Sequence, residues 1–115
     1  MNNKYLEEVT KLLKQTHPKL ATTYRLEFKN CFGAVAGYVD GHIFTSCGKF
    51  GIAFKLPPET LTELFREKDV TRLRYFSKGH IKKEYAVIPQ RIIDDQGRFK
   101  KILDKSIQHA LLVLS

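Results

Sequence analysis

The sequence predicts a single α+β domain over residues 1–115, with an antiparallel sheet and helices on one face, in the order α-β(3)-α-β(2)-α. Three observations predict this class. Apolar residues recur at helical spacing near both ends, they alternate with polar residues in between, and the predicted strands follow one another in runs instead of alternating with helices. A length of 115 residues suits one domain with one hydrophobic core.

The first predicted element is a helix over residues 3–16. Asn2 or Asn3 can cap its start, and Pro18 ends it. Its apolar side chains fall on one stripe at helical spacing, at Tyr5, Leu6, Val9, Leu12 and Leu13.

A continuous antiparallel meander of three or four strands is predicted over residues 24–56. The period changes there from 3.6 to about 2, which is typical of half-buried strands. Asp40-Gly41 predicts a tight hairpin turn, because both central residues of that turn need positive φ. The expected strands begin around Tyr24 and then cover residues 32–39, 42–47 and 50–56.

The remaining elements are a helix, two strands and a final helix. Pro57-Pro58-Glu59 starts the first of these helices, and strands follow at 71–76, with Leu73 and Tyr75 inside, and at 81–88. Asp94 or Asp95 can cap the last helix. That helix has an unbroken apolar face, formed by Phe99, Ile102, Leu103, Ser106, Ile107, Ala110, Leu111 and Leu114.

Reactive side chains do not form a familiar catalytic or metal-binding pattern. The two cysteines, Cys31 and Cys47, are too far apart for a zinc ribbon, and the four histidines lack the spacing of close metal ligands. His42 and Cys47 are five residues apart in one strand and cannot pair within it. We therefore expect no catalytic residue, no metal and no cofactor. The acidic N-terminus and the lack of a long apolar run predict a cytoplasmic protein without a membrane span.

The most function-like feature is a basic stretch between Arg66 and Lys83. It holds seven cations against Glu67 and Asp69, which is seven minus two, or +5 of the chain's net +8. Cations interleaved with aromatic rings can bind a nucleic-acid backbone and stack on its bases. A solvated basic face is the alternative, because strand alternation turns Tyr75 and Tyr85 inward. The candidate nucleic-acid or anion contacts are Arg66, Arg72, Arg74, Lys78, Lys82 and Lys83.

A family resemblance rests on residues 31–44, CFGAVAGYVDGHIF. This segment resembles the signature of the TfoX N-terminal domain, with a Phe-Gly start, a strand, an Asp-Gly turn and an aromatic residue beyond it. Residues 54–56 and 83–89 resemble later strands of the family. Cys31 stands where the family usually has methionine, and Ala34 where it usually has a second glycine. The signature positions are Phe32, Gly33, Gly37, Tyr38, Asp40, Gly41, Tyr85 and Pro89.

The resemblance implies a fold of the α-β(3)-α-β(2)-α type and a link to the regulation of natural competence. It supplies no catalytic residue. We therefore expect a non-enzymatic regulatory or protein-interaction module that presents a sheet face or edge to a protein partner or to a second copy of itself. The alternative is a nucleic-acid-binding accessory protein that uses the basic face around residues 66–83.

Overall fold

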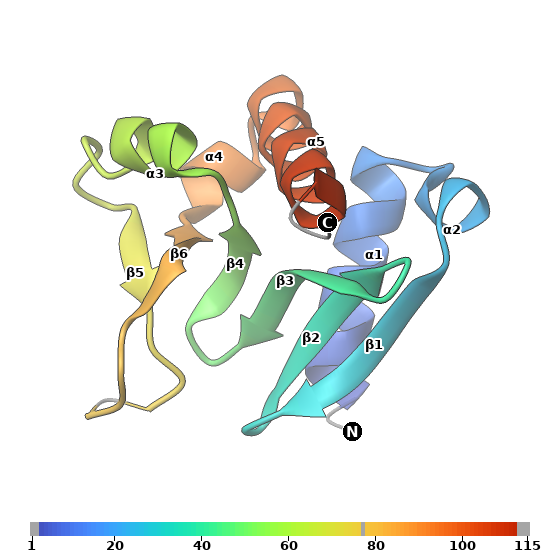
Figure 1. Cartoon of the computed structure of the whole chain (residues 1–115), viewed down its shortest axis with the longest axis horizontal. Coiled ribbons are helices and arrows are strands. Elements are labelled where there is room, and N and C mark those ends of the chain that lie inside the picture. The colour runs from blue at the N-terminus through green and yellow to red at the C-terminus, as the bar shows by residue number, and fades with distance from the viewer. Residues whose placement is uncertain (1–2, 77, 113–115) are drawn as a thin grey trace.

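Six strands form one antiparallel sheet in the order β1-β2-β3-β4-β6-β5 (Figure 1). This computed structural model describes residues 3–76 and 78–112. The helices are α1 (Asn3–Thr16), α2 (Leu20–Thr23), α3 (Pro58–Leu64), α4 (Gln90–Ile93) and α5 (Gln96–Leu112). The strands are β1 (Leu26–Cys31), β2 (Ala34–Val39), β3 (His42–Gly48), β4 (Gly51–Lys55), β5 (Thr71–Leu73) and β6 (Lys82–Ile88).

The predicted class, a single α+β domain with an antiparallel sheet, is confirmed. Four strands precede α3, because Gly51–Lys55 forms its own pairing with β3 after a tight turn. The short helices α2 and α4 add to the predicted order. The possible cap at Asn2 and the apolar position Leu114 lie outside the described residues.

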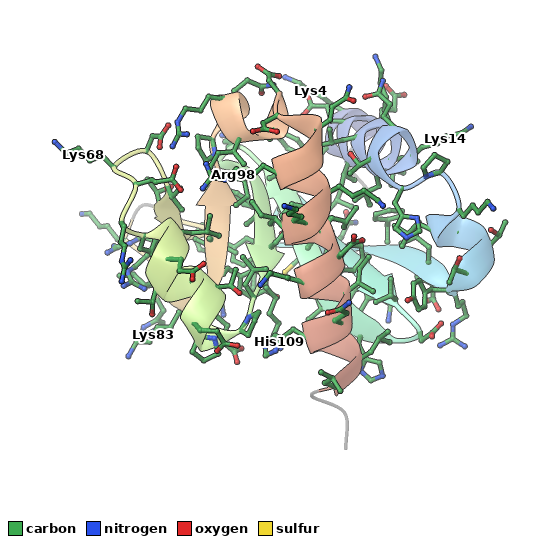
Figure 2. The ribbon with its side chains drawn as sticks, turned by 90° about the horizontal axis from the view of Figure 1, so that it is seen from above. Lys4, Lys14, Lys68, Lys83, Arg98 and His109 are labelled. Atoms are coloured by element: carbon green, nitrogen blue, oxygen red, sulfur yellow. The ribbon has the colours of Figure 1, made fainter. Side chains whose placement is uncertain are left out.

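The helices lie on one face of the sheet and enclose the main core (Figure 2). Val9 and Leu13 of α1 and Phe99 and Leu103 of α5 are almost completely buried there. Phe99 meets Phe54 of β4 edge to face, with ring centroids 5.5 Å apart. A second, smaller cluster lies on the other face of the sheet. It contains Ala53, Leu73, Tyr85 and Val87, with Phe50 and Tyr75 packed against it.

The Asp40-Gly41 turn forms as predicted. Asp40 has φ 49° and Gly41 has φ 84°, the left-handed pair that this hairpin requires. The Asp40 carboxylate accepts a hydrogen bond of 2.8 Å from the backbone N–H of Arg25, and the Asp40 N–H donates to the Arg25 carbonyl at 2.9 Å. The turn is thereby fixed to the start of β1.

Glycine is required at Gly37 for reasons of space. The pairing of β2 with β3 shifts register between Gly37 and Tyr38, where β3 has one extra residue, Phe44, and forms a bulge opposite Gly37. A Cβ at Gly37 would lie 2.7 Å from Cγ2 of Thr45 and 3.2 Å from the ring of Phe28. The small residues of the signature therefore allow close packing inside the sheet.

Helix α5 is held by side-chain hydrogen bonds at its start and on its buried face. Asp95 precedes the helix, and its carboxylate accepts a hydrogen bond of 3.2 Å from the Arg98 N–H, as the predicted cap requires. Further along, the buried hydroxyl of Ser106 lies 2.7 Å from the carbonyl oxygens of both Phe44 and Lys55. The helix is thus bonded to β3 and to β4.

The predicted strand over residues 71–76 is shorter in the structure. β5 ends at Leu73 after a register shift between Arg72 and Leu73. The inward orientation of Leu73 and Tyr75 is confirmed, but both side chains pack on the sheet face opposite the helices. The shift in register ends the regular pairing of β5 with β6, and the residues after Leu73 leave the strand with Tyr75 packed against the smaller cluster.

Candidate functional site

Two hairpin ends that are far apart in the sequence meet on the sheet face opposite the helices. Phe32, in the turn between β1 and β2, has its ring centroid 5.6 Å from those of both Tyr75 and Phe76. Phe50 contacts Tyr75 edge to face at 5.7 Å. We call these four residues the aromatic patch. Phe32 and Phe76 are 66% and 57% exposed, although most large apolar side chains of the chain are buried.

The backbone at Phe32 adopts an unusual conformation. Its φ is 50°, and that of Gly33 is 81°, so the pair forms a two-residue hairpin turn. A left-handed conformation costs a bulky residue about 1–2 kcal/mol, and asparagine or glycine would tolerate it better. The strained turn therefore holds a large apolar ring in solvent, a combination that is enriched at functional sites.

The tyrosines beneath the patch are held by the sheet. Tyr75 donates a hydrogen bond of 3.0 Å to Ser46, and burial raises the pKa of Tyr75 to about 12. Burial also raises the pKa of Tyr85, which is only 8% exposed. The predicted inward orientation of both rings is confirmed. Neither ring is free to stack on a nucleic-acid base, and among the phenylalanines and tyrosines of the described residues the exposed rings are those of Phe32 and Phe76.

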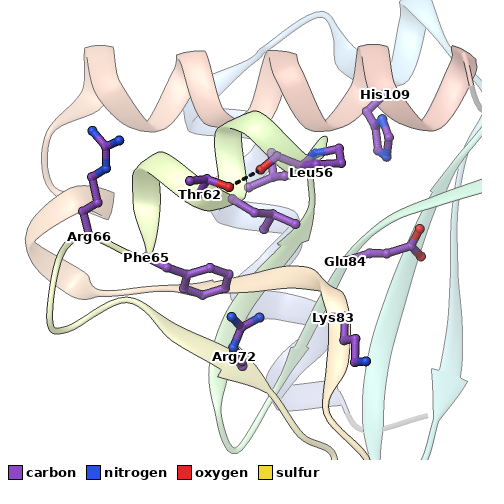
Figure 3. Close-up of a pocket in the computed structure, with 10 residues that line it drawn as sticks. Leu56, Thr62, Phe65, Arg66, Arg72, Lys83, Glu84 and His109 are labelled. Carbon is purple, nitrogen blue, oxygen red and sulfur yellow. Dashed lines mark hydrogen bonds between the residues drawn. The ribbon is translucent and has the colours of Figure 1, made fainter.

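A hollow lies on the helical face, between α3, the start of β6 and the C-terminal part of α5 (Figure 3). It has a volume of about 650 Å³. We call it the basic cleft. Its lining combines apolar side chains with three cations, and consists of Leu56, Pro58, Leu61, Thr62, Phe65, Arg66, Arg72, Lys83, Glu84 and His109.

The cations of the basic cleft are exposed. The Arg72 guanidinium lies 4.4 Å above the ring of Phe65, which holds it in place by a cation–π contact. Arg66 and Lys83 lie at opposite ends of the cleft (Figure 3). Within residues 3–76 and 78–112, none of these three cations forms an ion pair with a carboxylate.

The acids nearest to these cations are engaged elsewhere. Glu67 accepts hydrogen bonds from Arg98 of α5 and Arg91 of α4, and Arg91 also binds Asp69 at 2.7 Å. The two arginines lower the pKa of Glu67 to about 2, and Arg91 lowers that of Asp69. Glu84 lies 3.6 Å from Lys55. Arg66, Arg72 and Lys83 therefore have no ion-pair partner in the described residues, and the cleft keeps a surplus of positive charge beside Glu84.

The predicted basic stretch is divided by the fold. Arg66, Arg72 and Lys83 line the basic cleft, whereas Arg74, Lys78 and Lys82 are exposed outside it. Phe65, which directly follows α3, and His109 of α5 complete the cleft, and sequence reasoning did not predict either as a site residue. Phe32 was predicted to begin a strand over residues 32–39, which was wrong: β2 begins at Ala34, and Phe32 lies exposed in the turn before it because its backbone is left-handed.

Cys47 is built into the core. Burial, together with the charge of Glu8, raises the pKa of its thiol to about 11, which disfavours the reactive thiolate. In the described part of the chain, no three His, Cys, Asp or Glu side chains lie close enough together to hold a metal ion. None of the helices in residues 3–76 and 78–112 has the length and apolar character needed to cross a membrane.

Comparison with known protein families gives one clear result. The model of the TfoX N-terminal domain matches residues 19–110, which includes every strand and helices α2 to α4. Comparison with the curated proteins and with the solved structures found no match. The match covers most of the chain and includes both the Phe32-Gly33 and the Asp40-Gly41 turns. The chain belongs to the TfoX N-terminal domain family.

Proposed function

We propose that this chain is a non-enzymatic regulatory module that acts by binding a protein partner through the aromatic patch. Membership of the family supports a competence-related regulatory module at the level of the family. To this family-level role the proposal adds a binding surface, the aromatic patch, and a kind of contact, the burial of aromatic rings. It places the partner against Phe32 and Phe76, at the ends of two hairpins.

One observation carries this proposal. Two large rings stay exposed and in contact with each other, and one of them occupies a strained turn. Aromatic side chains dominate the energetics of protein interfaces, where burial of each ring contributes strongly to affinity. The Phe32 ring contacts Tyr75, which in turn packs against Phe50, so the patch is connected to the sheet. A protein surface with an apolar pocket would cover them.

Site-specific crosslinking tests the proposal. A photoreactive phenylalanine analogue is placed at Phe76 in the full chain, expressed in its native host, and irradiated. We expect one discrete adduct, whose mass distinguishes a second copy of this chain from another protein. The adduct should disappear when Phe32→Asn is added. The same analogue at the exposed position Gln108 on α5 is the control. An adduct that is equally strong at Gln108, or that survives Phe32→Asn, would contradict the proposal.

A second candidate is a nucleic-acid-binding accessory role for the basic face around residues 66–83. Its support is the surplus of positive charge, since Arg91 and Arg98 engage the acids of this segment. Such binding should weaken steeply as salt is raised. Replacing Arg72, Arg74, Lys82 and Lys83 by Gln should weaken it for every sequence tested. Unchanged binding after these replacements removes this candidate.

A further inference from the structure

We propose that the basic cleft binds an acidic peptide segment that carries an apolar anchor residue. This site is separate from the aromatic patch, because the cleft lies on the helical face and the patch on the opposite face of the sheet. The occupant is a segment of a protein partner in which carboxylates flank an aliphatic side chain.

The charge of the cleft selects an anion. Arg66, Arg72 and Lys83 lie at its rim without a carboxylate partner in the described residues. The two acids that follow α3 cannot neutralise them, because Glu67 and Asp69 are held by the arginines of α4 and α5. A carboxylate that reaches Arg72 would gain a charge-assisted hydrogen bond without first breaking an internal ion pair.

The floor of the cleft selects an aliphatic group. Leu56, Pro58 and Leu61 line it, and they present aliphatic surface. Phe65, the one phenylalanine in the lining, has a face covered by the Arg72 guanidinium and cannot stack fully on a base. A hollow of about 650 Å³ has the size of a small-ligand pocket, which suits one anchor side chain and its neighbours.

These features favour a peptide over a nucleic acid. A phosphate backbone needs a row of cations and free stacking rings, whereas the cleft offers three cations around an aliphatic floor. Glu84, at the Lys83 end, adds a negative charge that would repel a continuous run of phosphates. A segment with separated carboxylates can place them at Arg72 and Arg66 and leave Glu84 uncovered.

The test uses a short fluorescent peptide in which one leucine is flanked on both sides by glutamates. Two matched peptides replace the glutamates by glutamine or the leucine by serine. Binding to the full chain is measured by fluorescence anisotropy. We expect the parent peptide to bind and both matched peptides to bind roughly tenfold more weakly. The cleft variant, Arg72→Gln with Lys83→Gln, should show a similar loss.

A charge-matched control separates the cleft from net charge. Lys11→Gln with Lys14→Gln removes two exposed cations of α1, which contributes no residue to the cleft, and should leave binding unchanged; Figure 2 shows Lys14 on the opposite side of α5 from Lys83. Amide shifts of the wild-type chain, measured by NMR with the parent peptide, should move around Leu61, Phe65 and Arg72 and not around Phe32 or Phe76. This measurement stands even if the cleft variant folds poorly.

Three results would overturn the inference. They are equal binding of the parent and glutamine peptides, shifts that cluster at the aromatic patch, and displacement of the peptide by a lower concentration of single-stranded DNA. The last result would assign the cleft to nucleic acid. Loss of the Phe76 crosslink in the Phe32→Asn variant is independent of all three, so this inference and the proposed function can fail separately.

Discussion

The Ser106 hydroxyl lies 2.7 Å from the carbonyl oxygen of Phe44, a residue 62 positions earlier in the chain. The same hydroxyl reaches the Lys55 carbonyl, so one small side chain serves two neighbouring strands. Ser106 therefore has a structural role that its place on an otherwise apolar helix face does not indicate.

Ser106→Ala should destabilise the domain by about 1–3 kcal/mol, because the single hydroxyl hydrogen that serves two carbonyl oxygens is lost and one of these contacts is fully buried. Urea unfolding followed by circular dichroism measures this change. Gln108→Ala, at an exposed position of the same helix, should have little effect. Equal stability of the Ser106 variant and the wild type would show that water or a shift of the helix replaces these bonds.

Gly37→Ala should cost about 1–3 kcal/mol, since its Cβ would overlap Thr45 and crowd Phe28 within a tightly packed sheet. Thermal unfolding provides the measurement. Gly97→Ala is the matched control, because its Cβ meets nothing closer than 3.9 Å and the site lies in the first turn of α5. The control should be neutral or slightly stabilising. A Gly37 variant as stable as the control would contradict the crowding argument.

Phe32→Asn should leave stability within about 1 kcal/mol of the wild type. Relief of the left-handed backbone, about 1 kcal/mol, offsets the ring contacts that are lost, which are of similar size. Partner binding through the aromatic patch should fall sharply in the same variant. Unfolding curves and the crosslinking yield at Phe76 measure the two effects. A large loss of stability with intact crosslinking would make Phe32 a structural residue.

Stability should depend on Glu67 at acidic pH. The arginines lower the Glu67 pKa from 4.5 to about 2, so its contribution is present above pH 4.5 and is lost as the pH falls towards 2. Urea midpoints measured across this window should fall less steeply for Glu67→Gln than for the wild type. Glu63→Gln, at an exposed position, should follow the wild-type curve. Parallel curves for Glu67→Gln would exclude this linkage.

Cys47 should resist alkylation in the folded protein. Burial and a pKa raised to about 11 lower the thiolate fraction at pH 8 by about two orders of magnitude relative to a free thiol. In a Cys31→Ser background, iodoacetamide should label Cys47 rapidly only after urea is added, as measured by mass spectrometry. Fast labelling without urea would show that the packing around Cys47 opens readily.

Most helices and strands were predictable from the sequence, because their apolar periodicity and turn residues lie within short segments of the chain. The stripe from Tyr5 to Leu13 and the Asp40-Gly41 turn carry their structure in a few adjacent residues. The end of β5 at Leu73 was not predictable in this way, since a bulge depends on the partner strand.

The candidate sites were less accessible to sequence reasoning. The basic stretch included Arg72 and Lys83 of the cleft, but the apolar residues Leu56, Pro58 and Leu61 come from α3 and the segment before it, and His109 comes from α5. The contact of Phe32 with Phe76 joins two turns that no periodicity connects. Both surfaces arise from contacts between distant segments, which a single sequence does not encode in any local pattern.

Helix α1 ends before residue 19, where the family match begins, yet its Val9 and Leu13 are each only 1% exposed. A fragment cut at the boundary of the match would uncover the apolar surface of β2 and β3 that these side chains seal. The unit that folds is therefore longer than the unit that sequence comparison recognises. Many different amphipathic helices could cover the apolar surface of β2 and β3. The sequence of such a helix can therefore vary widely while the helix still covers the sheet.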